Sequence, residues 1–300
     1  MQVGLSAASH SVLDARRAGA HVIERVRAAA RSELASLSFG DQHVVAGDAY
    51  FQNTPTLGRA LAEWTGRPAG CLFLLPLWHP VLVAEQVGTL AALHDGPFIL
   101  QTGLGGGEAQ FAAMGADLGE RAARFEEAAR IIRALLEGET VSSERFGFVE
   151  ATIGLRPPSP VDWWVGAGAP VGLRRAARMG AAWYTAPGLT PDALVTPLEI
   201  YRDACAREDR TPRVMARKDA TISADPTVLT AARQQVERGY RGVGLDQVVV
   251  ATPDHAVEQL APFAELGVEQ MVIRTMGVTP ESDLETIHHL STVQRALQGT

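Results

Sequence analysis

The sequence predicts an eight-fold (β/α) TIM barrel. Eight short apolar runs alternate with amphipathic segments over 300 residues, and polar or glycine-rich breaks follow several of the runs. A helix between two buried strands implies a parallel sheet, because the chain must return before it can begin the next strand. Such barrels usually take about 250 residues plus insertions. We therefore expect residues 1–300 to form one domain, with insertions at the carboxyl edge of the barrel.

The apolar runs and the helical periodicities give the elements in order. Strands are expected at residues 2–5, 37–39, 72–75, 98–100, 163–165, 183–185 and 271–273, and a seventh strand is expected to begin at 214–216. Helices are expected at 11–34, 56–64, around 84–86, and at 121–136, 171–179, 191–207, 252–266 and 284–297. The stretch 226–247 has no clear pattern. Because side chains alternate along a strand, only one of Trp163 and Trp164 can face the barrel interior.

An open, doubly wound sheet is the alternative fold. Its dinucleotide-binding form carries the pattern G-x-G-x-x-G between a strand and a helix. Two glycine turns begin like this pattern, but the last glycine is replaced by Glu108 in the first turn and by Val171 in the second. Neither turn supports that alternative.

Composition excludes several classes of protein. The formal charge is -7 with no basic run, which argues against a nucleic-acid or anionic-membrane partner. The two cysteines, Cys71 and Cys205, have no metal-like or redox-like spacing, which is typical of a reduced cytoplasmic protein. No signal peptide or membrane-spanning run is evident. A metal-dependent barrel would need converging ligands, but strands five, six and eight lead into Gly166, Ala186 and Thr275, so we expect no metal.

Two histidines follow predicted strands at the edge where barrel active sites lie. His43 is placed to relay a proton, since its ordinary pKa lies near 6.5, and Asp41 is placed to orient it. The alternative is a loop histidine that caps a turn with Asp41. His79 follows the next strand beside Trp78, which could stack on a ligand ring. The alternative for His79 is that it holds the turn through a backbone hydrogen bond.

A glycine-rich loop follows the fourth strand. Its glycines let a ligand approach the backbone, and desolvation of Glu108 would suit that carboxyl for general-acid chemistry. The alternative is that Glu108 only complements the dipole of the helix it begins. The loop residues proposed to bind a ligand are Gly103, Gly105, Gly106 and Gly107.

A second glycine turn joins the fifth strand to a helix. The free amides and the dipole at a helix N-terminus favour a phosphate there. The alternative is that the glycines serve only a tight turn. The residues concerned are Gly166, Ala167, Gly168 and Ala169.

The chain resembles the luciferase-like flavin and deazaflavin oxidoreductases over nearly its whole length. The order and spacing of several short motifs carry the resemblance. They are Trp78-His79-Pro80, Ala84-Glu85-Gln86, Gly103-Leu104-Gly105, Arg121–Glu126, Gly138 before Val141, Arg156-Pro157, Trp164–Gly168, Thr252-Pro253 and Leu266-Gly267-Val268. The resemblance implies a barrel that holds a reduced flavin-type cofactor at its carboxyl edge, with the cofactor phosphate at the Gly166 turn.

One loop indicates the type of cofactor. Gly105–Ala109 is most similar to the loop of the deazaflavin-dependent sugar-phosphate dehydrogenases, in which a glutamate at this place is a catalytic acid. This similarity favours coenzyme F420 over FMN. The chain departs from the family pattern where the usual Asp-His reads Asp41-Gln42-His43, and where Asp95–Phe98 replaces the usual small-Gly-Gly-Arg.

The expected function is therefore cytoplasmic hydride transfer between F420 and a small organic substrate. One alternative is a two-component monooxygenase that uses FMN and a separate reductase. Another is a non-catalytic flavin-binding or partner-subunit member of the family. Family relatives are commonly homodimers, so we expect a homodimer. We expect the substrate to be selected by residues 47–55, 138–150 and 218–247.

Overall fold

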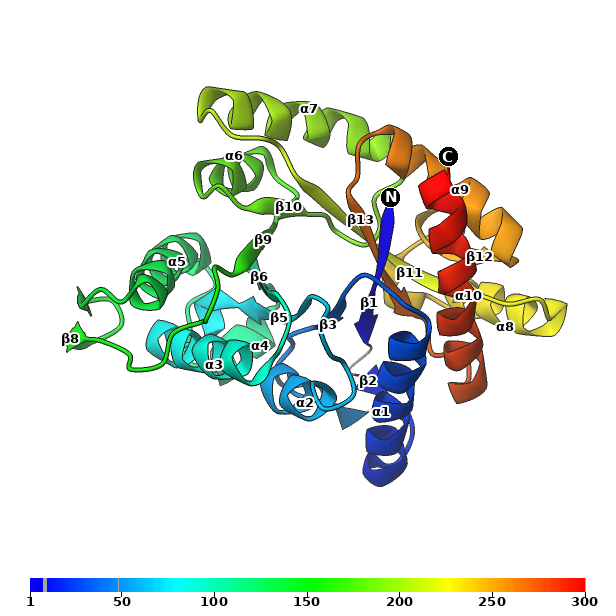
Figure 1. Ribbon diagram of the computed structural model, residues 1–300, viewed down its shortest axis with the longest axis horizontal. Coiled ribbons are helices and arrows are strands. Elements are labelled where there is room, and N and C mark those ends of the chain that lie inside the picture. The colour runs from blue at the N-terminus through cyan, green and yellow to red at the C-terminus, as the bar shows by residue number, and fades with distance from the viewer. Residues whose placement is uncertain (8–9, 48, 300) are drawn as a thin grey trace.

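Eight parallel strands close into a barrel in the computed structural model, which confirms the predicted fold (Figure 1). The structure describes residues 1–7, 10–47 and 49–299. Pairing of β10 with β11 and of β13 with β1 closes the sheet. Around the barrel the strands are β1 (Gln2–Ala7), β3 (Leu37–Phe39), β5 (Ala69–Leu74), β6 (Phe98–Gly103), β9 (Asp162–Gly166), β10 (Ala182–Tyr184), β11 (Val214–Ile222) and β13 (Gln270–Thr275).

The longer helices lie outside the barrel, so that their apolar stripes pack on the sheet, whereas the short α4 belongs to the loop after β6. Asp14 and Thr190 cap two of them by accepting hydrogen bonds from Arg17 N–H and Ala193 N–H. Gly138, at φ 91°, ends α5 in the left-handed conformation, consistent with the predicted stop there. The helices are α1 (Ala15–Arg31), α2 (Asn53–Ala60), α3 (Pro80–Leu93), α4 (Glu108–Ala113), α5 (Arg121–Glu137), α6 (Pro170–Arg178), α7 (Pro191–Arg207), α9 (Pro253–Glu265) and α10 (Pro280–Gly299).

Several strands extend beyond the predicted apolar runs. β5 begins at Ala69, because Ala69 and Gly70 pair with Phe98 and Ile99 of β6 although neither has a large apolar side chain. β11, which was expected to begin at residue 214 and had no predicted end, runs to Ile222 because its charged residues continue to pair with β13.

A helix occupies the part of the chain that showed no pattern. α8 (Pro226–Glu237) begins where the Asp225 carboxylate accepts a hydrogen bond from Thr227 N–H. It buries Leu229, Ala232 and Val236, a narrow stripe among polar residues, which explains why its periodicity was weak. Two short helical turns, η2 (Tyr240–Gly242) and η3 (Leu245–Gln247), then lead to β12 (Val249–Ala251), which pairs with the end of β11.

The two tryptophans of β9 face opposite sides of the sheet, which confirms the expected alternation. Trp164 lies inside the barrel with Ile99, Tyr184 and Met215, whereas Trp163 packs in the core between barrel and helices. Both indole N–H groups have acceptors, with Trp163 donating to Thr102 Oγ1 at 2.9 Å and Trp164 to Asp162 Oδ2 at 2.9 Å. The inward-facing positions of the other strands follow from their register with Trp164.

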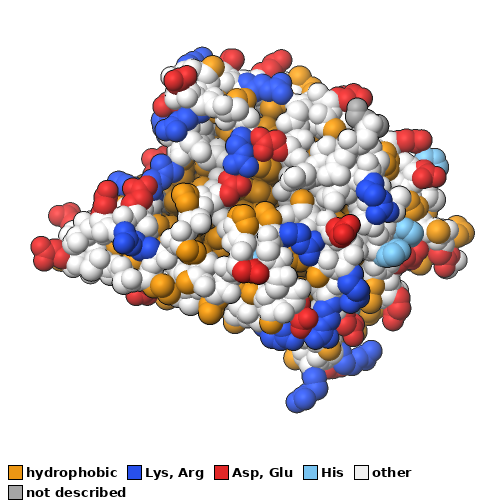
Figure 2. Space-filling view, viewed as in Figure 1, with side chains coloured by type: hydrophobic (Ala, Val, Ile, Leu, Met, Phe, Trp, Pro, Cys, Tyr) orange, Lys and Arg blue, Asp and Glu red, His pale blue; other side chains and the backbone are white. Residues whose placement is uncertain are grey.

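Two small antiparallel sheets lie outside the barrel sheet. In one, β2 (His10–Ser11), which follows β1, pairs with β4 (Ala49–Tyr50), which follows β3. The other is the hairpin of β7 (Val141–Ser143) and β8 (Phe148–Ala151). Acidic and basic side chains are interspersed on the face shown in Figure 2. Among the described residues, no helix has the length and apolarity needed to cross a membrane.

Candidate active site at the carboxyl edge of the barrel

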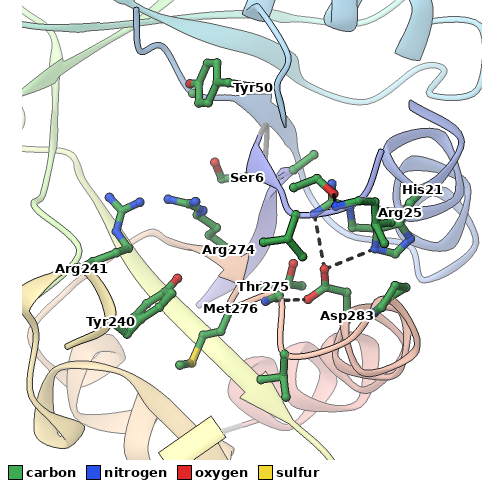
Figure 3. A pocket seen from close by; sticks show the side chains of 18 of the residues that line it. Ser6, His21, Arg25, Tyr50, Tyr240, Arg241, Arg274, Thr275, Met276 and Asp283 are labelled. Atoms are coloured by element: carbon green, nitrogen blue, oxygen red, sulfur yellow. Dashed lines mark hydrogen bonds and ion pairs between the residues drawn. The ribbon is translucent and has the colours of Figure 1, made fainter. Parts of the chain in front are cut away.

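A cavity of about 620 Å³ opens at the carboxyl ends of β1, β3, β11 and β13 (Figure 3). The β2–β4 sheet, α1, the start of α10 and the segment that follows α8 complete its wall. This end of the barrel is where the active sites of such folds lie. Side chains that line the cavity include Ser6, Asp41, Tyr50, Arg217, Tyr240 and Arg274.

Asp41 is the centre of a buried polar cluster beside this cavity. Its Oδ2 accepts hydrogen bonds from Leu74 N–H at 2.7 Å and from Trp78 Nε1 at 2.8 Å. Its Oδ1 lies 3.3 Å from His43 Nε2, an ion-pair contact without hydrogen-bond alignment. The His43 ring also tilts against Trp78, with the ring centroids 5.4 Å apart. The structure therefore brings together Asp41, His43 and Trp78, which come from the ends of two neighbouring strands.

Burial of Asp41 perturbs its titration. Only 8% of the residue is exposed, and this desolvation raises the pKa of the carboxyl despite the opposing hydrogen bond from Leu74 and the nearby His43 and Trp78. The folded state thus binds a proton at Asp41 more tightly than the unfolded chain does. The stability associated with that proton is present below the ordinary Asp pKa and is lost as the pH rises through the raised pKa.

We expect Asp41→Asn to raise the free energy of unfolding relative to the wild type at pH 7. The amide keeps an acceptor for Leu74 N–H and Trp78 but carries no buried charge. The gain should shrink as the pH is lowered through the raised pKa of Asp41, and it should be gone below about 4, where the wild-type carboxyl is protonated in both the folded and the unfolded state. Urea unfolding at a series of pH values measures the difference. A variant that is destabilised most at neutral pH would contradict this assignment of the pKa shift.

The glycine loop after β6 is attached to the His43 loop by one glutamine. Gln110 Oε1 accepts a hydrogen bond from His43 N–H at 2.8 Å, and Gln110 Nε2 donates to Gly106 O at 2.7 Å. Gly105 and Gly107 have φ values of 67° and 88°, which side chains other than glycine rarely adopt. These contacts hold the first turn of α4 near the Asp41 cluster.

Glu108 begins α4 and is exposed. The sequence had suggested that the Glu108 carboxyl would be desolvated, because it follows three glycines, and the structure does not show this. The reason is that its neighbours on the loop, Gly106 and Gly107, have no atoms within 4 Å of the place where a Cβ would be, so the loop stands clear of the rest of the protein.

The two glycines in the turn between β9 and α6 differ in their surroundings, since Gly166 is closely packed and Gly168 is not. A Cβ on Gly166 would lie 3.2 Å from Thr102 O, so close packing on β6 explains this residue. A Cβ on Gly168 would meet nothing within 4 Å, and both Gly168 and Ala169 are exposed directly before the first turn of α6. Ala167 instead uses its carbonyl to accept from Trp183 Nε1 at 2.8 Å. Gly168 and Ala169 therefore lie exposed beside the N-terminus of α6, where a helix dipole favours an anion.

His79 points away from the Asp41 cluster. It is exposed, and its Nε2 lies 3.3 Å from Phe146 O in the β7–β8 hairpin. Its ring contacts the rings of Phe146 and Phe148, with centroids 5.9 and 5.6 Å away. His79 therefore serves the contact with the hairpin, close to the structural alternative considered for it.

The sequence reasoning missed the arginines of the cavity. Arg217 and Arg274 lie on inward-facing positions of β11 and β13, as their register with Met215 and Val272 shows. Arg241 reaches the cavity from η2. The available signal was an arginine two residues after an inward-facing apolar residue, and it was overlooked because strand seven was given a start at residue 214 but no end.

The barrel fold, together with the cavity at the carboxyl ends of its strands, is typical of barrels that bind an organic ligand above the strand ends. Within the described ranges, no three His, Cys, Asp or Glu side chains are placed to hold a metal ion. The chain belongs to the luciferase-like monooxygenase family, whose family model matches residues 1–270. The resemblance inferred from the short motifs is thereby confirmed.

Relatives and solved structures agree with this membership. An F420-dependent glucose-6-phosphate dehydrogenase of Amycolatopsis mediterranei is 28% identical over 256 residues, covering 73% of this chain and 76% of the relative. An F420-dependent secondary alcohol dehydrogenase, solved with an F420–acetone adduct, has the same fold with a TM-score of 0.83 at 16% identity, covering 99% and 98% of the two chains. The oxygenating constituent of a Pseudomonas putida 3,6-diketocamphane monooxygenase, solved with FMN, gives a TM-score of 0.75 at 14% identity, covering 98% of each chain.

Proposed function

We propose that this protein is an oxidoreductase that binds F420, or alternatively FMN, at the carboxyl edge of its barrel and acts on a small organic substrate. The observation that carries the proposal is the meeting of the Asp41 cluster and the Glu108 loop at the mouth of a luciferase-like barrel. The curated relatives named as F420-dependent dehydrogenases support F420 as the preferred cofactor. The FMN-bound structural neighbour supports the alternative.

Two features of the protein fit a cofactor of this type. Ser38 Oγ and Gln101 Nε2 are buried on inward-facing positions of β3 and β6 and make no hydrogen bond within the protein. Buried polar atoms without partners call for a polar ligand or ordered water above them. The exposed Gly168 and Ala169 at the start of α6 would receive the phosphate. Gly106 and Gly107, where a Cβ would meet nothing within 4 Å, would admit the ring, and Gly103 and Gly105, packed on Leu74, would hold that loop in place.

The residues of the chain would handle the protons. When bound and reduced, F420 supplies a hydride, whereas FMN activates oxygen. His43 Nε2 would hold or release a proton at the cofactor side, and Asp41 Oδ1, at 3.3 Å, would orient the imidazole and stabilise its charged form. Glu108 would donate a proton from its carboxyl at the entrance, and Trp78 would pack beside the ring.

Titration of the purified protein with oxidised F420 and, separately, with FMN tests the proposal. We expect micromolar binding of F420 that is at least tenfold tighter than that of FMN, an affinity difference of about 1.4 kcal/mol. Preference for FMN would assign the protein to the two-component monooxygenases. Binding of neither cofactor would contradict the proposed site, and tight binding without turnover on any substrate would indicate a non-catalytic member.

We further propose that the protein is a homodimer, and that the FMN alternative would require a separate reductase. Light scattering of the purified chain tests the first statement, with twice the 32.0 kDa chain mass as the expected result. A monomer at all concentrations would contradict it.

A further inference from the structure

Four arginines line the cavity and the proposed cofactor chemistry uses none of them; Arg25 contacts Asp283, and the other three lie together at the opposite wall. Arg217 and Arg274 are on neighbouring barrel strands, and Arg241 is on η2. Figure 3 shows the guanidinium groups of Arg241 and Arg274 and the hydroxyl of Tyr240 turned toward the same part of the cavity. The three guanidinium groups therefore converge on one end of this space.

Their charges are only partly balanced. Asp219 Oδ1 lies 3.4 Å from Arg217 Nη2, and Asp219 Oδ2 lies 3.3 Å from Arg241 Nε and accepts a hydrogen bond from Tyr240 Oη at 3.1 Å. Three positive charges and one negative charge leave a surplus of two. Elsewhere on the wall, Asp283 contacts Arg25 at 3.5 Å, and the buried Asp41 lies on the far side with its own donors.

Arg274 is the arginine of this group whose charge is least balanced by its neighbours. Among the residues that the structure describes, no carboxylate lies within 4.0 Å of its guanidinium group, and its buried Nε makes no hydrogen bond. Burial and the two neighbouring arginines lower the pKa of Arg274 to about 10, so the group is still charged at neutral pH. The buried Nε of Arg217 also has no hydrogen-bond partner. A buried positive charge without a partner is costly, and an anionic ligand would offset that cost.

We infer that Arg217, Arg241 and Arg274 form a subsite for the anionic group of the substrate, a phosphate or a carboxylate. The planar guanidinium group matches both oxyanions with paired hydrogen bonds, and Tyr240 adds a hydroxyl donor. The inference rests on the proposed function, because only an enzyme would bind this anion as its substrate. It identifies the substrate class as small organic oxyanions, bound with the charged end at β11 and β13.

The position of the subsite separates it from the phosphate of the cofactor. The Gly166–Ala169 turn follows β9, and β10 and β11 lie between β9 and β13 around the barrel. None of the four turn residues lines the cavity. The cavity instead extends from the arginines to Asp41 and Gln42 at the end of β3. A substrate held by its anionic end would thus direct its other end toward the Asp41 cluster.

Calorimetric titration of the cofactor-free protein with inorganic phosphate, and separately with acetate, tests the subsite. We expect the wild type to bind at least one of these anions and Arg274→Gln to weaken that binding about tenfold or more. Arg241→Gln, at a position that is 39% exposed, should weaken it as well and provides a second variant if Arg274→Gln does not fold. Arg238→Gln is the matched control, since Arg238 is exposed at the end of α8 outside the cavity.

The same variants are titrated with F420, FMN and riboflavin. Unchanged affinities for all three, together with lost anion binding, support a substrate subsite. Weaker FMN binding with unchanged riboflavin binding would show that the arginines hold the cofactor phosphate and would overturn the inference. Absence of anion binding by the wild type would also overturn it. Anion binding by a protein that binds no cofactor would refute the proposed function and leave the anion site standing.

Discussion

Glu108→Gln is expected to lower turnover about 100-fold while leaving the Kd of the cofactor nearly unchanged. The amide keeps the size of the side chain and its place at the start of α4 but cannot donate an acidic proton. The loss should therefore fall on kcat, because an interaction made only in the transition state is removed. Steady-state kinetics with the best substrate from a screen of alcohols, sugars and activated alkenes, alongside cofactor titration, measure both quantities.

Glu139→Gln is the control for this experiment. Glu139 is also exposed, and it follows α5 outside the cavity. Its replacement should leave both turnover and cofactor affinity unchanged. Unchanged turnover in Glu108→Gln would remove Glu108 from the mechanism, and a large loss of cofactor affinity would give it a binding role instead.

Gly70→Ala is expected to cost about 3 kcal/mol or more of the free energy of unfolding. A Cβ at this position would lie 1.8 Å from Ile99 O and 2.8 Å from Ile99 Cβ, so β5 and β6 would have to separate. The same two strands carry Leu74, which hydrogen-bonds Asp41, and the glycine loop. Urea unfolding followed by circular dichroism measures the loss, and cofactor binding should weaken in parallel.

Gly154→Ala is the matched substitution in open space. A Cβ on Gly154 would meet no atom within 4 Å. The free energy of unfolding should stay the same or rise by up to about 1 kcal/mol, because alanine restricts the unfolded chain. Equal unfolding midpoints for Gly70→Ala and the wild type would contradict the packing described for β5 and β6.

The barrel was predictable because its strands are fully buried and its helices carry apolar stripes. The glycine after α5 and the two tryptophans of β9 allowed local statements that the structure confirms. α8 was missed because it buries only three residues and lies among polar ones. The end of β11 was missed because Arg217 and Asp219 look like loop residues, although both face the barrel interior.

The sequence predicted the site only for residues whose positions are fixed by the order of the strands. Asp41, His43 and Trp78 meet because β3 and β5 are neighbours, which follows from chain order in this fold. The order of the strands does not determine where a side chain in the following loop points. His79, for example, is directed toward Phe146. The convergence of Arg217 with Arg241 required η2 to be positioned by α8, a helix that the sequence did not reveal.

The segments expected to select the substrate divide into two groups. Residues 47–55 and 218–247 contribute Tyr50, Tyr240 and Arg241 to the cavity, whereas residues 138–150 contribute none of the residues that line it. Within the first of these segments, Asp48 lies outside the described residues. Substrate selection is therefore expected to depend on the β2–β4 sheet and on the chain after α8 rather than on the β7–β8 hairpin.

A crystal structure of the protein with bound F420 tests the central claim most directly. We expect the cofactor phosphate on the amides of Gly168 and Ala169, and the ring above the ends of β3, β5 and β6, within reach of His43 and Glu108. A cofactor whose phosphate lies on Arg217 and Arg274, or whose ring lies away from the carboxyl edge, would contradict it.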